Sequence, residues 1–106
     1  MAAGFDAAGF EVWVTDVDAA ALADVPASWH ARVCDAADEA AVAAVMAEAG
    51  SLDVLCANAG IAGPTAQIED VDLADWQACV SVNLEGAFLA VKHGLPAMKA
   101  AGRGSV

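Results

Sequence analysis

Hydrophobic and polar positions in the first third of the chain predict a strand, a short helix and a second strand. Residues 11–16 (EVWVTD) are β-branched and aromatic and predict a short strand. Asp18 can cap a helix that extends to Val25 and stops before Pro26. Residues 29–35 (WHARVCD) alternate with the period of a strand, and His30, Arg32 and Cys34 form the wetter face. The second strand is therefore expected at a sheet edge.

The remainder of the chain predicts helix, strand and helix. In residues 37–49 the larger apolar residues recur at helical spacing, acids stand at the start, and Gly50 is placed to end the helix. Residues 52–57 (LDVLCA) predict a strand too apolar for an edge. A long helix is expected from about Asp72, with Gly94 and Pro96 disturbing its last turns. One apolar stripe is expected on its packed face: Leu73, Trp76, Val80, Leu84, Ala87, Phe88, Val91 and Leu95.

Strands alternating with helices over short connections indicate βαβ units, and hence an α/β fold with a doubly wound parallel sheet. Ligands of such sheets bind beyond the carboxyl ends of the strands. Three predicted strands end in polar or very small residues: Asp16, Asp35, and the triplet Asn58, Ala59 and Gly60. These residues are expected on one rim of the sheet.

Composition and charge narrow the function classes. The 106 residues allow one domain, and 15 acids against 4 bases give a formal net charge of -11. Such a chain repels nucleic acid and anionic membrane surfaces, so neither is an expected partner. No signal peptide or membrane span is predicted. Three cysteines without a CxxC pair, read as buried thiols, favour the reducing cytoplasm, and no metal site is predicted.

Each candidate residue also has a structural interpretation. Asp16 can start a turn, Asp35 can cap the next helix, and Asn58 can occupy a left-handed turn. Asn83 is different, because its spacing from Trp76 and Val80 puts it on the packed side of the long helix. A primary amide there must find partners or cost about 1–3 kcal/mol.

Together these residues resemble one family, the short-chain dehydrogenases/reductases. The resemblance rests on Asn58-Ala59-Gly60 continuing as IAGP, on Trp76, on VNLEGAF at 82–88, and on TDVD ending an upstream strand. It covers nearly the whole chain. It implies a Rossmann-like sheet and hydride transfer between a nicotinamide cofactor and a secondary alcohol or carbonyl substrate.

The resemblance also assigns roles. Asp16 matches the acid that accepts hydrogen bonds from the adenosine ribose, which favours NAD over NADP because a carboxylate repels a 2′-phosphate. Asp35 and the Ala36 backbone match the position that holds the adenine amino group. Asn58, Ala59 and Gly60 match the motif that stabilises the central sheet and lines the adenosine side, with small residues admitting the dinucleotide and the amide tying strands and loops together. Asn83 matches the asparagine of the Asn-Ser-Tyr-Lys tetrad. Complete members of the family are usually homo-oligomers.

Departures from the family pattern define what is missing. The chain has no tyrosine. The serine and lysine of the tetrad are also unmatched, because Ser105 precedes the strand that leads to the family serine. No glycine-rich turn follows a first strand. Residues 1–106 are therefore expected to be a partial dinucleotide-binding domain that lacks the first strand and the C-terminal half and is inactive alone.

Two alternatives remain from other functional classes. A non-catalytic remnant or binding module would keep this fold without the chemistry, which the absence of tyrosine favours. A receiver-like signalling domain would need a phosphoacceptor aspartate at the carboxyl end of the middle strand. Asn58 holds that position and cannot accept phosphate. The discriminating observations are dinucleotide binding and the coding sequence on either side of this segment.

Overall fold

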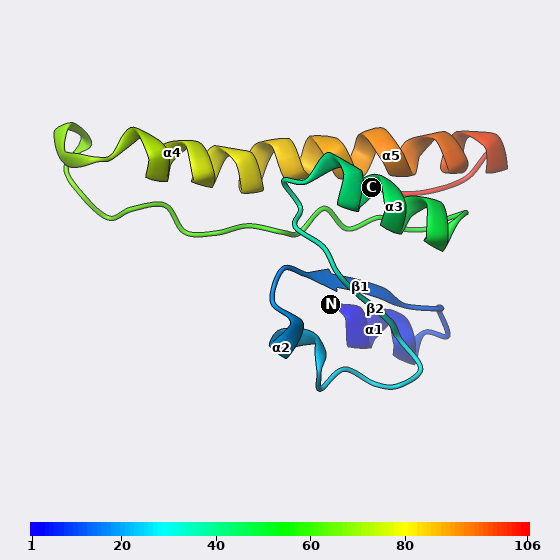
Figure 1. Ribbon diagram of the computed structural model, residues 1–106. Helices are drawn as coiled ribbons and strands as arrows, with labels where there is room; N and C mark the ends of the chain where they lie inside the picture. The colour runs from blue at the N-terminus through cyan, green and yellow to red at the C-terminus, as the bar shows by residue number, and fades with distance from the viewer. The chain divides into compact units, whose positions relative to one another are not determined.

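The computed structural model describes residues 1–106, which form two compact units, Met1–Asp35 and Ala36–Val106. The first unit contains α1 (Ala2–Ala7), β1 (Trp13–Asp16), α2 (Ala19–Leu22) and β2 (His30–Val33). The second contains α3 (Glu39–Ala49), η1 (Ile68–Asp70), α4 (Leu73–Val80), η2 (Ser81–Glu85) and α5 (Gly86–Ala101). Figure 1 labels the main helices and both strands.

The first unit confirms the predicted strand, helix and strand. Strands β1 and β2 pair in parallel, with Trp13 opposite His30 and Asp16 opposite Val33. Helix α2 begins as predicted, because Asp18 Oδ1 accepts a hydrogen bond from the backbone N–H of Ala20 at 2.8 Å. It ends at Leu22, three residues earlier than predicted.

The two faces of β2 are the reverse of the prediction at its carboxyl end. Val33 is 61% exposed, whereas Cys34 is buried. The face that carries His30 and Arg32 is packed against Trp13: the His30 ring lies 4.4 Å from the Trp13 ring at 15°, and the Arg32 guanidinium lies 5.1 Å above it. These polar side chains therefore cover their own face of the strand.

Local signals at both ends determine where helix α3 of the second unit begins and ends. Asp38 Oδ1 accepts hydrogen bonds from the N–H groups of Ala40 and Ala41, at 2.9 and 3.2 Å. Gly50 ends the helix with a φ of 71°, a conformation that favours glycine. The helix packs along α5 (Figure 1) and buries Val42.

The predicted strand at 52–57 is reduced to a single parallel bridge between Val54 and Ser105. Leu55 N–H donates to Ser105 O at 2.9 Å, and Ser105 N–H donates to Asp53 O at 3.0 Å. A regular strand needs a longer ladder than this single bridge supplies. The segment still contributes to the core of its unit, because Leu55 is buried.

The long helix is confirmed and continues further than predicted, because α4, η2 and α5 follow one another without a break. Pro96 lies inside α5 and does not end it. Buried Leu89 and Met98 anchor α5 on both sides of the proline, so packing outweighs the lost backbone hydrogen bond. The helix ends at Gly102, which has the left-handed φ of 70°.

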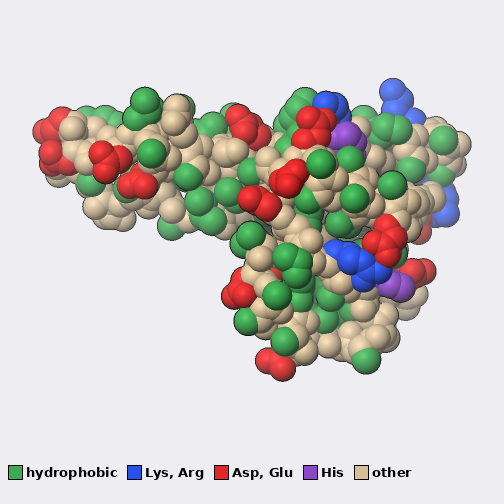
Figure 2. All heavy atoms as spheres, in the orientation of Figure 1, with side chains coloured by type: hydrophobic (Ala, Val, Ile, Leu, Met, Phe, Trp, Pro, Cys, Tyr) green, Lys and Arg blue, Asp and Glu red, His purple; other side chains and the backbone are tan.

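The apolar stripe assigned to the packed face of this helix is largely exposed. Trp76 is 53% exposed, Leu84 66% and Phe88 62%. The buried positions of α5 are instead Gly86, Leu89, Gly94 and Met98. A hydrophobic pattern does not count glycines, although glycines allow the closest approach between two elements. The pattern therefore predicted the wrong face of the helix. Figure 2 shows hydrophobic atoms on the surface of the long helix and acidic atoms gathered where it begins.

Candidate functional site

The loop after the bridged segment carries the triplet Asn58, Ala59 and Gly60. All three residues are exposed. The backbone N–H of Asn58 donates to Cys56 O at 2.9 Å, while its side-chain amide has no partner. The tie between strands and loops that the sequence analysis assigned to the Asn58 amide is therefore absent from this structure.

The tie to the helix is made by Asn83 instead. Its Oδ1 accepts a hydrogen bond from the backbone N–H of Ile61 at 2.7 Å, and its Nδ2 donates to Ile61 O at 2.9 Å. One primary amide thus satisfies both backbone groups of the residue that follows the triplet. The prediction that Asn83 needs hydrogen-bond partners is confirmed. Its predicted burial is wrong, because the residue is exposed: the helix turns its glycine-bearing face, and not this one, toward the core.

Asn83 lies in the middle of η2, the π-helical turn between α4 and α5. The widened turn is defined by the bond from Gly86 N–H to Ser81 O, five residues back. Ser81 Oγ also donates to Glu85 Oε2 at 2.7 Å within the turn. Such single π-turns inside α-helices are rare and frequently occur at functional sites.

Glycines let the loop approach the helix. A Cβ on Gly60 would lie 3.2 Å from Asn83 Oδ1, and one on Gly63 would lie 3.3 Å from Cys79 Sγ. Contacts within the protein therefore disfavour a side chain at either position, even when no ligand is bound. The small size of Gly60, which the sequence analysis attributed to an approaching dinucleotide, already has a cause in the Asn83 amide.

Ala36 contacts the same long helix. A Cβ on Gly86 would lie 3.1 Å from Ala36 Cβ and 3.3 Å from Ala36 O. The structure thus brings two predicted site residues to neighbouring positions: Asn83 clamps the loop, and Ala36 packs on Gly86, three residues further along.

Asp16 and Asp35 belong to the first unit. The expectation that strand ends meet at one edge is confirmed for this pair, because the backbone N–H of Cys34 donates to Asp16 O at 2.9 Å. Asp16 Oδ1 accepts from Asp18 N–H at 2.9 Å, and Asp16 Oδ2 has no partner in the protein. Both aspartates are exposed.

Sequence reasoning missed two participants, the Ile61 backbone and Cys79. Cys79 lies one helical turn before Asn83, and its Sγ is 3.2 Å from Asn83 Nδ2. The available signal was a Gly-x-x-Gly loop together with a Cys-x-x-x-Asn helix. The prediction of three buried thiols is also wrong, since only Cys34 is buried and Cys56 is exposed.

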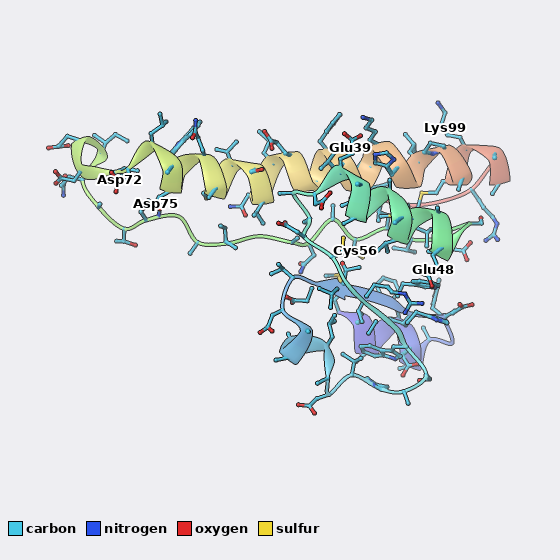
Figure 3. The ribbon with its side chains drawn as sticks, in the orientation of Figure 1. Glu39, Glu48, Cys56, Asp72, Asp75 and Lys99 are labelled. Atoms are coloured by element: carbon cyan, nitrogen blue, oxygen red, sulfur yellow. The ribbon has the colours of Figure 1, made fainter.

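A charged cluster joins α3 to α5 in the same unit. Glu39 Oε1 accepts from Lys92 Nζ at 2.5 Å and lies 3.0 Å from His93 Nε2. The hydrogen bond from Lys92 lowers the pKa of Glu39 below its ordinary value of 4.5, and the contact with His93 adds to the effect. Figure 3 shows Glu39 on α3 beside the long helix.

No group of three or more histidine, cysteine, aspartate or glutamate side chains could hold a metal ion. An open, mostly apolar hollow of about 290 Å³ lies between the loop and α4, and is lined by Gly63, Pro64, Ala66, Ile68, Val71, Trp76 and Cys79. None of the helices combines the length and the apolar character that a membrane crossing requires.

The family model described as short chain dehydrogenase matches residues 1–106. The chain belongs to this family. The cis-4-hydroxycyclohexanecarboxylate dehydrogenase of Sinomonas cyclohexanicum is 49% identical over 76 residues, which cover 68% of this chain and 30% of that enzyme. The chain therefore spans less than a third of that curated relative.

Solved structures confirm that this chain has the Rossmann-like fold of the short-chain dehydrogenases. A levodione reductase superposes with a TM-score of 0.91 at 29% identity, over 97% of this chain and 45% of the other. A metagenomic short-chain oxidoreductase in complex with NADP gives 0.87 at 31% identity, over 97% and 51%. An NAD⁺-bound xylitol dehydrogenase gives 0.82 at 28% identity, over 92% and 42%. Nicotinamide dinucleotides are thus the cofactors of the family, in both forms.

Proposed function

We propose that residues 1–106 are the adenosine-binding part of an NAD-preferring short-chain dehydrogenase. In its complete form, the enzyme transfers hydride between the nicotinamide and a secondary alcohol or carbonyl substrate. The observation that supports this most directly is the Asn83 amide, which clamps Ile61 immediately after Asn58-Ala59-Gly60. It joins the two family motifs of this chain through one side chain.

The donor and acceptor groups of the first unit fit the adenosine end of a dinucleotide. Asp16 presents an oxygen without a protein partner at the carboxyl end of β1, where a ribose hydroxyl can donate to it. The same negative charge opposes a 2′-phosphate, so NAD is preferred over NADP. By resemblance to the family, and not from the relative placement of the two units, we propose Asp35 and the Ala36 backbone for the adenine amino group, and Ala59 and Gly60 for the adenosine side of the cofactor.

When bound, the dinucleotide supplies the hydride chemistry. The contribution of this chain is binding and orientation, with Asn83 fixing the helix turn against the cofactor loop. No tyrosine is present to exchange a proton with the substrate oxygen. We therefore expect no turnover from these residues alone, since missing acid–base chemistry costs roughly 10²- to 10⁴-fold in rate.

The same features fit a second candidate, a non-catalytic module that binds a dinucleotide. Sequencing the coding DNA on both sides of this segment separates the two. A glycine-rich turn upstream, and a serine followed by Tyr-x-x-x-Lys downstream, support the dehydrogenase. For the complete protein we further propose a homo-oligomer, as the family resemblance implies. We also propose the cytoplasm as its location, since free cysteines suit a reducing compartment.

The cofactor assignment is tested by titrating the chain with NAD and with NADP by calorimetry. We expect weak binding that favours NAD, and an Asp16→Ala variant with a smaller preference. Asp24→Ala is the matched control, because it removes the same charge from an exposed turn of the same unit. Equal affinity for both cofactors, unchanged by Asp16→Ala, would remove Asp16 from this role.

A further inference from the structure

The amide of Asn83 makes one more contact than the clamp on Ile61 requires. Its Nδ2 carries two protons, and Ile61 O, at 2.9 Å, takes only one of them. Cys79 Sγ lies 3.2 Å from the same nitrogen, one helical turn earlier. Sulfur is a weak acceptor, and this separation is short for such a bond.

The thiol of Cys79 is itself held by the loop. Its Sγ lies 3.8 Å from Ile61 O, toward which the S–H can donate. A Cβ on Gly63 would lie 3.3 Å from the sulfur, so the loop backbone passes directly over it. The sulfur is therefore fixed between the loop and α4, on the Nδ2 side of the Asn83 amide.

We propose that Cys79 is a positioning residue for Asn83. By accepting the second Nδ2 proton, its sulfur holds the amide with Oδ1 toward Ile61 N–H and Nδ2 toward Ile61 O. The flipped amide would set oxygen against oxygen and N–H against N–H at Ile61, and would also lose the sulfur contact. The pair spans the junction of α4 and η2, so it fixes the amide where the helix changes its hydrogen-bond pattern.

The functional meaning of this contact rests on the proposed function. Asn83 is the one residue of the family tetrad matched in this chain, and a site residue must be held within about 0.5 Å of its productive position by its supporting contacts. Cys79 supplies such support on a side of the amide that Ile61 leaves open. Loss of the sulfur would loosen the loop that carries Asn58, Ala59 and Gly60.

A different explanation is that Cys79 only fills space beneath Gly63. Two variants separate acceptor from volume. Cys79→Ser keeps a hydrogen-bond acceptor in a smaller side chain, whereas Cys79→Val keeps the volume and has no acceptor. A positioning role predicts that serine preserves the state of Asn83 and valine disturbs it, and a space-filling role predicts the reverse.

The experiment measures hydrogen exchange by ¹H–¹⁵N NMR on the full 106-residue chain. The readouts are the Asn83 side-chain protons and the Ile61 backbone N–H. In Cys79→Val both should exchange about three- to tenfold faster, the factor that corresponds to one lost hydrogen bond. Cys79→Ser should stay close to the unmodified chain. Valine with normal protection, or serine with lost protection, contradicts the proposal.

The unmodified chain supplies a second test that needs no variant to fold. Asn58 carries the same side-chain amide without a partner, so it is an internal reference. Both Asn83 Nδ2 protons should exchange more slowly than those of Asn58, and equal rates for the proton facing the sulfur would overturn the assignment. These measurements involve neither cofactor nor turnover. Failure of NAD binding would therefore count against the proposed function and leave this result standing.

Discussion

Gly94 and Leu55 are in such close contact that a Cβ at position 94 would lie 2.9 Å from Leu55 Cδ2. The same Cβ at position 94 would lie 3.5 Å from Met46 Sδ. Helix α5 therefore meets both α3 and the bridged segment at this glycine. Leu55 is buried, and its side chain has little room to move away.

We therefore expect Gly94→Ala to lower the free energy of unfolding by about 1–3 kcal/mol, despite the better helix propensity of alanine. Urea denaturation followed by circular dichroism measures this. In a Leu55→Val background the clashing atom is gone, and the same substitution should be neutral or stabilising by up to about 1 kcal/mol. Gly4→Ala, at a helical glycine with open space around it, is the control. Equal costs in both backgrounds would show that the Leu55 contact is not the cause.

Glu39 makes the free energy of unfolding depend on pH in the acidic range. Its pKa is lowered in the folded chain, mainly by the hydrogen bond from Lys92, so its contribution is fully present above the unfolded-state value and is lost as pH falls through the folded one. Glu39→Gln should reduce stability at neutral pH, and the difference from the unmodified chain should shrink as pH drops below 4.5. Thermal melts from neutral pH into acid measure this difference. Glu69→Gln, which removes the same charge from an exposed site, should show no such convergence. A constant difference for Glu39→Gln across the whole range would argue against the ion pair.

Amide exchange should alternate along β1. His30 N–H and Cys34 N–H donate to Val12 O and Asp16 O, so the geometry of a parallel pair directs the N–H groups of Val14 and Asp16 toward β2. The N–H groups of Trp13 and Thr15 then point to the other edge, which no strand of the sheet occupies. Hydrogen exchange by NMR should be slow at 14 and 16 and fast at 13 and 15. Protection at 13 and 15 that rises with protein concentration would show instead that this edge pairs with another chain.

The sequence predicted those elements whose ends are set by local chemistry. Asp38 and Gly50 bound α3 through a side-chain cap and a positive φ, and both signals are visible in the residues themselves. The strand at 52–57 could not be predicted correctly, because a ladder depends on its neighbours and only the segment at Ser105 pairs with it. The path of the helix through Pro96 likewise depends on tertiary packing.

The candidate site was predicted in part for the same reason. The need of Asn83 for partners followed from its residue type, but the identity of those partners did not. Ile61 contributes only its backbone, which leaves no signature in a sequence. In the sequence Cys79 has the pattern of an ordinary apolar residue, and only the short distance of its sulfur from Asn83 Nδ2 indicates a role.

The bridge between Val54 and Ser105 also bears on the order in which this unit folds. Its two residues are separated by 51 positions (105 minus 54), so forming it closes a long loop, whereas the turns of α3, α4 and α5 close over a few residues. Contacts between residues far apart in the sequence stabilise the chain only after the entropy of loop closure has been lost. The helices should therefore collapse first, with the bridge added late and released early. The loop that carries Asn58 would then reach its native place only when the segment at Ser105 has docked.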